Sequence, residues 1–195
     1  MARPREHDDD TRDALLTHAR RLLHEEGPAA LSIRRVADAV GTTTRAIYSV
    51  FGSKEGLVRA LHREGFGGLD AELSTVPETD HPIADLYALA MAYRRSALAR
   101  PDLYEVMFAC PVPEFEPDAD DQALALGTLD RLRQAVARAV DTGIVRGDVE
   151  EDTIALWGLV HGLASLELNG VPPGVDPDRV WAGAVDAMLA GLSRP

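Results

Sequence analysis

Apolar residues recur at helical spacing along almost the whole chain, and no segment of useful length alternates apolar and polar residues as a strand does. The first apolar stripe closes at the Gly-Pro pair 27–28. Two short helices are expected next, over about 33–40 and 44–51, each followed by a glycine. A fourth helix begins after Ser53, and the glycines of "GFGG" (65–68) are expected to weaken its end.

The rest of the chain has the same pattern, with proline and glycine at every junction. The later helices are expected over 82–100, 101–110, 119–142, 151–169 and 177–192. The Arg- and Asp-rich first dozen residues have the composition of a disordered tail. The pattern therefore predicts an all-α fold of about nine helices.

The two short helices and the tight turn between them have the layout of a helix-turn-helix. At 100° per residue, the second of these helices has two different faces. Ala46, Ile47, Val50 and Phe51 fall on an apolar face, whereas the opposite face carries Thr44, Arg45, Tyr48 and Ser49. No Asp or Glu occurs from Gly41 through Lys54. An ordinary solvated helix face usually includes acids, so this composition favours contact with a polyanion.

The groups on this face suit DNA. Arg45 can donate a bidentate pair to guanine, threonine can meet a thymine methyl, and the Tyr48 hydroxyl can donate to phosphate. Lys54, beside the helix cap Ser53, is placed to hold a neighbouring phosphate. The simpler reading, a solvated face with no partner, stays open at this point.

Charge divides the 195-residue chain unevenly around a formal net charge of −12. Residues 1–62 carry ten Lys and Arg against nine Asp and Glu, whereas the remainder carries ten against 23. The acidity thus belongs to the C-terminal two-thirds and need not repel DNA from the N-terminal third. The lone Cys110 excludes a disulfide framework and a multi-cysteine metal site. A buried or half-buried Cys110 is favoured over a redox sensor.

We expect no metal and no other cofactor, because the acidic "HDDD" run near the N-terminus is typical of a solvated tail. No apolar run approaches the roughly 20 residues of a membrane span. The N-terminus lacks the apolar segment of a signal peptide, so we expect a cytoplasmic protein without membrane contact.

Residues 31–61, "LSIRRVADAVGTTTRAIYSVFGSKEGLVRAL", resemble the DNA-binding signature of the tetracycline-repressor (TetR) family of bacterial transcription regulators. The resemblance implies that Thr43, Thr44, Arg45 and Ser49 approach bases and that Ser32, Tyr48 and Lys54 hold phosphates. Thr42, Ser49 and Val50 differ from the residues common in the family. These departures concern which operator is read.

Family members follow this module with a helical domain that dimerises and holds a small ligand. "ALWGLVHGLASLELNGV" (155–171) and "YRRSALARPDLYEVMF" (93–108) resemble one C-terminal class, named for its Trp–His–Gly helix. Aromatic, Met and His side chains are candidates to line an apolar ligand cavity, although the same residues are common in plain core. These candidates are Tyr87, Met91, Tyr104, Met107, Phe108, Trp157 and His161.

The last two predicted helices carry more apolar surface than a small domain covers, which favours pairing with the same helices of a second chain. The expected dimer contacts are Gly162, Trp181, Val185, Met188 and Leu192. In the alternative, both helices complete the core of a monomer.

The sequence thus predicts a DNA-binding domain over 1–62 and an effector-binding and dimerisation domain over 63–195. The expected function is that of a dimeric repressor that binds a pseudo-palindromic operator and is released by a small apolar or amphipathic molecule. Two alternatives are a helical-bundle enzyme and a partner-binding protein with a non-functional DNA module. We expect no catalytic residues, since no paired Glu-x-x-His motif, nucleophile elbow or phosphate loop occurs.

Overall fold

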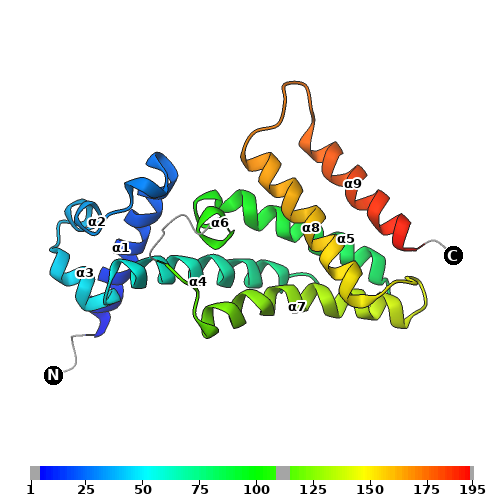
Figure 1. Ribbon diagram of the computed structural model, residues 1–195, viewed down its shortest axis with the longest axis horizontal. Helices are drawn as coiled ribbons and strands as arrows, with labels where there is room; N and C mark the ends of the chain where they lie inside the picture. Colours follow the sequence, from blue (N-terminus) through cyan, green and yellow to red (C-terminus); the bar gives the residue numbers. More distant parts are fainter. Residues whose placement is uncertain (1–4, 109–114, 194–195) are drawn as a thin grey trace. The chain divides into compact units, whose positions relative to one another are not determined.

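The structure, a computed structural model, describes residues 5–108 and 115–193 and contains only helices and turns in these ranges. The all-α prediction is confirmed, while Cys110 lies outside the described residues. The described helices are α1 (Arg5–Glu26), the 3-10 turn η1 (Pro28–Ala30), α2 (Ile33–Val40), α3 (Thr44–Phe51), α4 (Lys54–Leu73), α5 (Pro82–Ala99), α6 (Pro101–Phe108), α7 (Ala119–Asp141), α8 (Val149–Leu168) and α9 (Pro177–Leu192) (Figure 1).

The chain forms two compact units. The N-terminal unit comprises Met1–Phe66 with Arg100–Gln122, and the C-terminal unit comprises Gly67–Ala99 with Ala123–Pro195. Two of the three limits between the units therefore fall inside α4 and α7, and the third falls between α5 and α6. The N-terminal unit includes α6, which the predicted domain boundary between residues 62 and 63 assigns to the other domain. Where the DNA-binding function ends along the chain stays a prediction.

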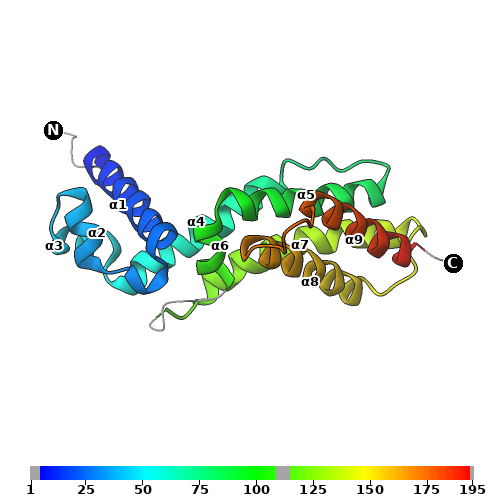
Figure 2. The ribbon, with the colours of Figure 1, turned by 90° about the horizontal axis from the view of Figure 1, so that it is seen from above.

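The core of the N-terminal unit is formed by the apolar faces of α1, α2, α3 and the first part of α4, with contributions from α6. Leu15, Val36 and Ile47 are completely buried in it. Leu103 and Val106 of α6 are also completely buried, and they belong to the same cluster. Figure 2 shows α1 beside the short helices α2 and α3. This packing fixes the helix-turn-helix on a rigid support.

Two expectations about helix ends are wrong. α1 begins at Arg5, so most of the expected tail is helical. α4 continues through "GFGG" to Leu73. Gly65 is buried there, and a Cβ atom on it would lie 2.6 Å from Met107, so this glycine permits the close approach of α6.

In the C-terminal unit, α5 packs against both α8 and α9, and α8 and α9 lie side by side (Figures 1 and 2). A polar group joins the three helices. Arg94 on α5 donates from Nη2 and Nε to the Glu167 carboxylate of α8 at 2.7 and 2.9 Å. Trp181 on α9 donates its indole N–H to Glu167 at 2.7 Å. Since all three groups are partnered, they hold the helices in one register.

Candidate nucleic-acid interface

The turn between α2 and α3 depends on a glycine in the left-handed region. Gly41 has φ 70° and ψ 30°, a conformation that costs other residues energy. Its N–H and that of Thr42 donate to carbonyls in the last turn of α2, and the Thr42 bond measures 2.9 Å. The turn therefore closes α2 and directs the chain into α3 without leaving those carbonyls unpaired.

The predicted division of α3 into two faces is confirmed. Ile47 is completely buried, and Val50 and Phe51 pack partly buried against the core. Thr44, Arg45, Tyr48 and Ser49 are all exposed, with Tyr48 at 51%. The Tyr48 phenol is therefore accessible to a partner at this face.

Three hydroxyls cap the helices around this face. Ser32 accepts the N–H of Arg35 at 3.2 Å, Thr43 accepts that of Ala46 at 3.3 Å, and Ser53 accepts that of Gly56 at 3.0 Å. A hydroxyl that accepts one N–H can still donate its own O–H. The capping geometry is thus compatible with the predicted donation from Ser32 to a phosphate, because it uses the oxygen and not the proton.

The acids bordering the face are engaged with arginines. Glu26 pairs with Arg35, and the hydrogen bonds from Arg35 lower the pKa of Glu26. Glu55 accepts from Arg59 at 2.8 Å. Because these carboxylates already have cationic partners, they oppose an approaching polyanion less than free carboxylates would. Arg45 is exposed on the acid-free face.

A buried carboxylate of α7 accepts hydrogen bonds from two arginines of α4. Asp121 is 0% exposed and accepts from Arg59 at 2.8 Å and from Arg63 at 2.5 Å. Burial disfavours its charge, but the bonds from Arg63 and Arg59 outweigh burial and lower the pKa of Asp121 to about 2. Arg59 also lies 5.5 Å from the ring centroid of buried Phe115. Sequence reasoning missed this group, whose members are about 60 residues apart and carry no local signal.

A second such contact joins α1 to α4 and α6. Arg20 donates to Glu64 at 2.9 Å and to Asp102 at 3.0 Å. The Asp102 side chain is only 7% exposed. Arg20 thereby connects three helices of the N-terminal unit, and it too was absent from the sequence-based prediction.

The seven predicted ligand residues divide between the two units. Tyr104 and Phe108 are ring neighbours in the N-terminal unit, with centroids 4.9 Å apart, and Met107 packs at Gly65. The remaining four, all partly buried, belong to the C-terminal unit: Tyr87, Met91, Trp157 and His161. The roles of all seven in ligand binding stay predictions.

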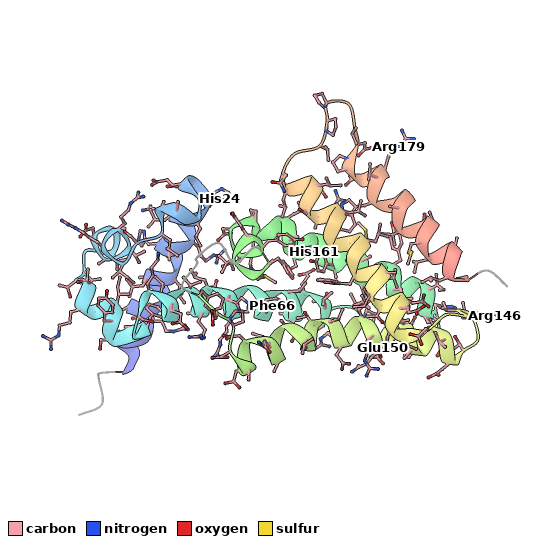
Figure 3. The ribbon with its side chains drawn as sticks, in the orientation of Figure 1. His24, Phe66, Arg146, Glu150, His161 and Arg179 are labelled. Carbon is pink, nitrogen blue, oxygen red and sulfur yellow. The ribbon has the colours of Figure 1, made fainter. Side chains whose placement is uncertain are left out.

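His161 is the best-defined of these residues (Figure 3). Its ring stacks on Trp157 at 5.2 Å, and its Nδ1 lies 3.0 Å from the hydroxyl of buried Tyr93. Burial lowers the pKa of His161, so the neutral ring is favoured at pH 7. Tyr93, which the sequence-based prediction did not include, is therefore part of this polar contact between α5 and α8.

The predicted dimer residues also divide. Trp181 and Val185 are 1% and 0% exposed within the chain itself, so they offer almost no surface to a partner. Gly162, Met188 and Leu192 keep part of their surface exposed. Large apolar side chains nearby on α8 and α9 are more exposed: Ile154 at 54%, Leu166 at 65% and Val180 at 40%.

A helix-turn-helix on a packed support, followed by a helical unit, defines a DNA-binding regulator. The family description "Bacterial regulatory proteins, tetR family" matches residues 15–61, and "Tetracyclin repressor-like, C-terminal domain" matches residues 86–188. The chain belongs to the tetracycline-repressor family of transcriptional regulators. The second description does not specify the Trp–His–Gly class, which stays a prediction.

Curated relatives are regulators by name. The HTH-type transcriptional regulator Rv1816 of Mycobacterium tuberculosis is 27% identical over 180 residues, covering 87% of this chain and 75% of that protein. The HTH-type transcriptional repressor AcnR of Corynebacterium efficiens is 28% identical over 156 residues, covering 76% of each.

Solved structures share the fold. A protein of unknown function from Rhodococcus sp. RHA1 is 28% identical with a TM-score of 0.83, covering 94% of this chain and 96% of that one. The TetR family transcriptional regulator PfmR from Thermus thermophilus is 25% identical with a TM-score of 0.76, covering 92% and 99%.

The described residues contain neither a membrane-spanning helix nor a metal-binding cluster. Within residues 5–108 and 115–193, no helix has both the length and the apolar composition needed to cross a membrane. The same part of the chain contains no group of three or more His, Cys, Asp or Glu arranged to hold a metal ion.

Proposed function

We propose that the protein is a repressor whose α3 enters the major groove, with Arg45, Thr44 and Ser49 at base edges. Thr43, Ser32, Tyr48 and Lys54 complete the DNA-binding set, the last three at phosphates. The observation that carries this proposal is the exposed, acid-free face of α3 on a helix whose other face is buried. The DNA-binding function is assigned to residues 1–62, with α6 and the start of α7 as structural support.

The proposed assembly is a homodimer through the exposed faces of α8 and α9. Exposed apolar side chains and small residues both occur on these faces, which suits close packing of helices from two chains. Gly162, Met188 and Leu192 border this surface, whereas Trp181 and Val185 support it from within. Two modules related by a two-fold axis fit a pseudo-palindromic operator.

The proposed effector is a small apolar or amphipathic molecule, for which the seven residues named above are the candidates. A ligand that favours a dimer unsuited to the operator weakens DNA binding by the same coupling free energy that DNA exerts on the ligand. α4 contains Lys54 at one end and reaches residues of the C-terminal unit at the other, so it is one route for such coupling. The proposal contains no catalytic step, and it places the protein in the cytoplasm, where a bacterial operator lies.

The proposal is tested by the set of genomic DNA fragments that the protein retains at moderate salt. Wild-type protein is expected to enrich a few fragments sharing one pseudo-palindrome, and Arg45→Ala is expected to lose that enrichment. Arg146→Ala is the matched control, because it removes the same charge from an exposed position of the C-terminal unit (Figure 3). Enrichment that survives Arg45→Ala, or no enrichment by wild type, would contradict the proposal.

A further inference from the structure

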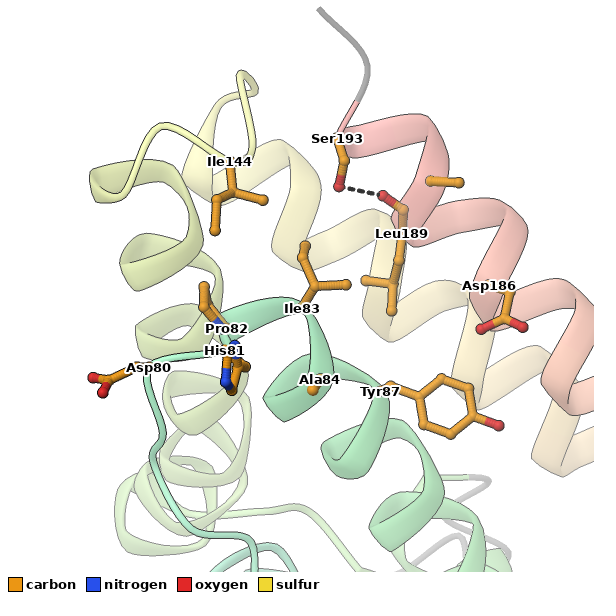
Figure 4. A pocket seen from close by; sticks show the side chains of 11 residues that line it. Asp80, His81, Pro82, Ile83, Ala84, Tyr87, Ile144, Asp186, Leu189 and Ser193 are labelled. Carbon is orange, nitrogen blue, oxygen red and sulfur yellow. Dashed lines mark hydrogen bonds between the residues drawn. The ribbon is translucent and has the colours of Figure 1, made fainter.

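The C-terminal unit has an open cleft between the start of α5 and the end of α9 (Figure 4). Its volume of about 690 Å³ falls within the range of small-molecule sites. Apolar groups form most of its wall, and a few polar side chains stand at the edge. The lining residues are Asp80, His81, Pro82, Ile83, Ala84, Tyr87, Ile144, Asp186, Leu189, Ala190 and Ser193.

Hydrogen bonds hold the α5 side of the cleft in place. Buried Asp85 accepts the Thr79 N–H at 2.9 Å and its hydroxyl at 2.7 Å. Arg138 of α7 donates to the same carboxylate at 3.3 Å. Burial opposes the charge of Asp85, yet these bonds keep its pKa below the ordinary value. The segment that carries His81 and Pro82 is thus fixed before any ligand arrives.

The opposite walls are fixed as well. Ile144 follows Gly143, whose φ is 73°, and precedes Val145, which is buried and bonded to Ala139. Ile144 itself stays 41% exposed because it faces the open cleft. At the end of α9, the Ser193 hydroxyl donates to the Leu189 carbonyl at 2.8 Å (Figure 4). A ligand therefore meets a preformed apolar wall and pays little to order it.

The charged lining side chains are acidic. Asp80 and Asp186 are the carboxylates, and neither Lys nor Arg occurs among the described lining residues. Figure 4 shows the Tyr87 ring and the Asp186 carboxylate at the same end of the cleft. An aromatic face and a carboxylate together attract an organic cation, while the apolar wall suits a hydrocarbon body. An anion would meet repulsion from the same groups.

The cleft lies away from the proposed dimer face. At 100° per residue, Asp186, Leu189, Ala190 and Ser193 share one flank of α9. The exposed positions Val180, Ala187 and Gly191 occupy a different flank, centred about 130° away around the helix. Dimerisation through that second flank would leave the cleft open to solvent.

We propose that this cleft binds a small organic cation with an apolar body, such as an alkylammonium. The site goes beyond the proposed function. Tyr87 lines it, whereas the other six predicted effector residues do not. Asp186 and the Tyr87 ring hold the cationic head, and Ile83, Ile144 and Leu189 contact the hydrocarbon chain.

The test is isothermal titration with octyltrimethylammonium below its micelle concentration, compared with octyl sulfate. Wild-type protein is expected to bind the ammonium at least tenfold more tightly than the sulfate. Asp186→Asn should weaken ammonium binding about fivefold, as expected for a partly solvated charge. Ala190→Trp, at an exposed position, should fill the cleft and weaken ammonium binding at least tenfold.

Two control variants locate the binding. Asp141→Asn removes an exposed acid, and Ala123→Trp adds the same bulk at an exposed position, both outside the cleft. Neither should change the ammonium affinity more than twofold. Equal affinity for octyl sulfate, or binding that Asp186→Asn and Ala190→Trp leave unchanged, would overturn the proposal. Retention of genomic DNA is measured on the same variants, so a loss of ammonium binding is distinguishable from a loss of DNA binding.

Discussion

At the scale of single residues, helix capping and the proposed DNA contacts fall on the same side chains. Ser32 and Thr43 accept backbone N–H groups with their oxygens, which fixes the starts of α2 and α3. Arg45 caps no helix among the described residues and is exposed on α3, so the proposed base contact is the only role assigned to it. Residues of these two kinds are expected to respond differently to substitution.

Arg45→Ala is expected to weaken binding to the best operator by about 1–3 kcal/mol of binding free energy. It should also relax the base preference at the contacted position, because it removes a base-edge contact. Lys54→Ala is expected to weaken binding to all DNA sequences alike. It should also reduce the slope of log affinity against log salt concentration by about one unit, as loss of one phosphate contact does. Titrations of specific and random DNA at several salt concentrations measure both effects. A change of base preference with Lys54→Ala but not with Arg45→Ala would reverse the assigned roles.

Asp121→Asn is expected to lower the free energy of unfolding at pH 7 by about 2 kcal/mol. The folded-state pKa of about 2 lies below the ordinary value of 3.8, so this stabilisation is present above pH 4 and is lost as pH falls toward 2. Urea denaturation at pH 7, 5, 4 and 3 should show the difference between wild type and variant shrinking below pH 4. Asp120→Asn, at an exposed neighbour, is the control. A difference that stays constant down to pH 3 would refute the ionic origin.

At the scale of elements, α4 shows packing overriding local propensity. Glycine inside a helix costs about 1 kcal/mol relative to alanine, yet α4 continues through the three glycines of "GFGG" (65–68). Gly65 is buried against Met107, whereas Gly67 is exposed with nothing within 4 Å of an added Cβ. The first glycine is therefore required by α6 and the second is not.

This contrast predicts opposite effects of one substitution. Gly67→Ala is expected to raise the free energy of unfolding by up to about 1 kcal/mol through helix propensity. Gly65→Ala is expected to lower it by about 1–3 kcal/mol, because the new methyl group displaces Met107. Urea denaturation of the two variants provides the comparison. Equal stability of the two would show that α6 does not need the glycine.

Local signals in the sequence located the elements well. Pro82, Pro101 and Pro177 each begin a helix as predicted, since proline is tolerated in a first turn. The two faces of α3 also follow from helical periodicity alone. Pairs such as Arg63 with Asp121 and Arg94 with Glu167 were out of reach, because periodicity carries no information on which helices meet. Trp181 was expected at a dimer surface, but its indole N–H donates a hydrogen bond to Glu167 of the same chain.

At the scale of the whole molecule, the exposed faces of α8 and α9 predict self-association. Leu166→Glu is expected to weaken the dimer at least tenfold, since it places a charge in an apolar contact. Leu126→Glu is the matched control, because Leu126 on α7 is 62% exposed and Leu166 is 65% exposed. Sedimentation at micromolar concentration measures both. A wild-type monomer, or equal effects of the two variants, would remove the proposed interface.

The central claim is that two copies of α3 read one operator, and a footprint on a retained genomic fragment tests it most directly. Hydroxyl-radical cleavage with wild-type protein is expected to show two protected half-sites in successive major grooves, with centres about 34–36 Å apart or somewhat more. At the lowest protein concentration at which wild type gives full protection, Arg45→Ala should lose protection of both half-sites together, whereas Arg146→Ala should leave both intact. A single protected segment without two-fold symmetry, or full protection by Arg45→Ala at that same concentration, would contradict this account.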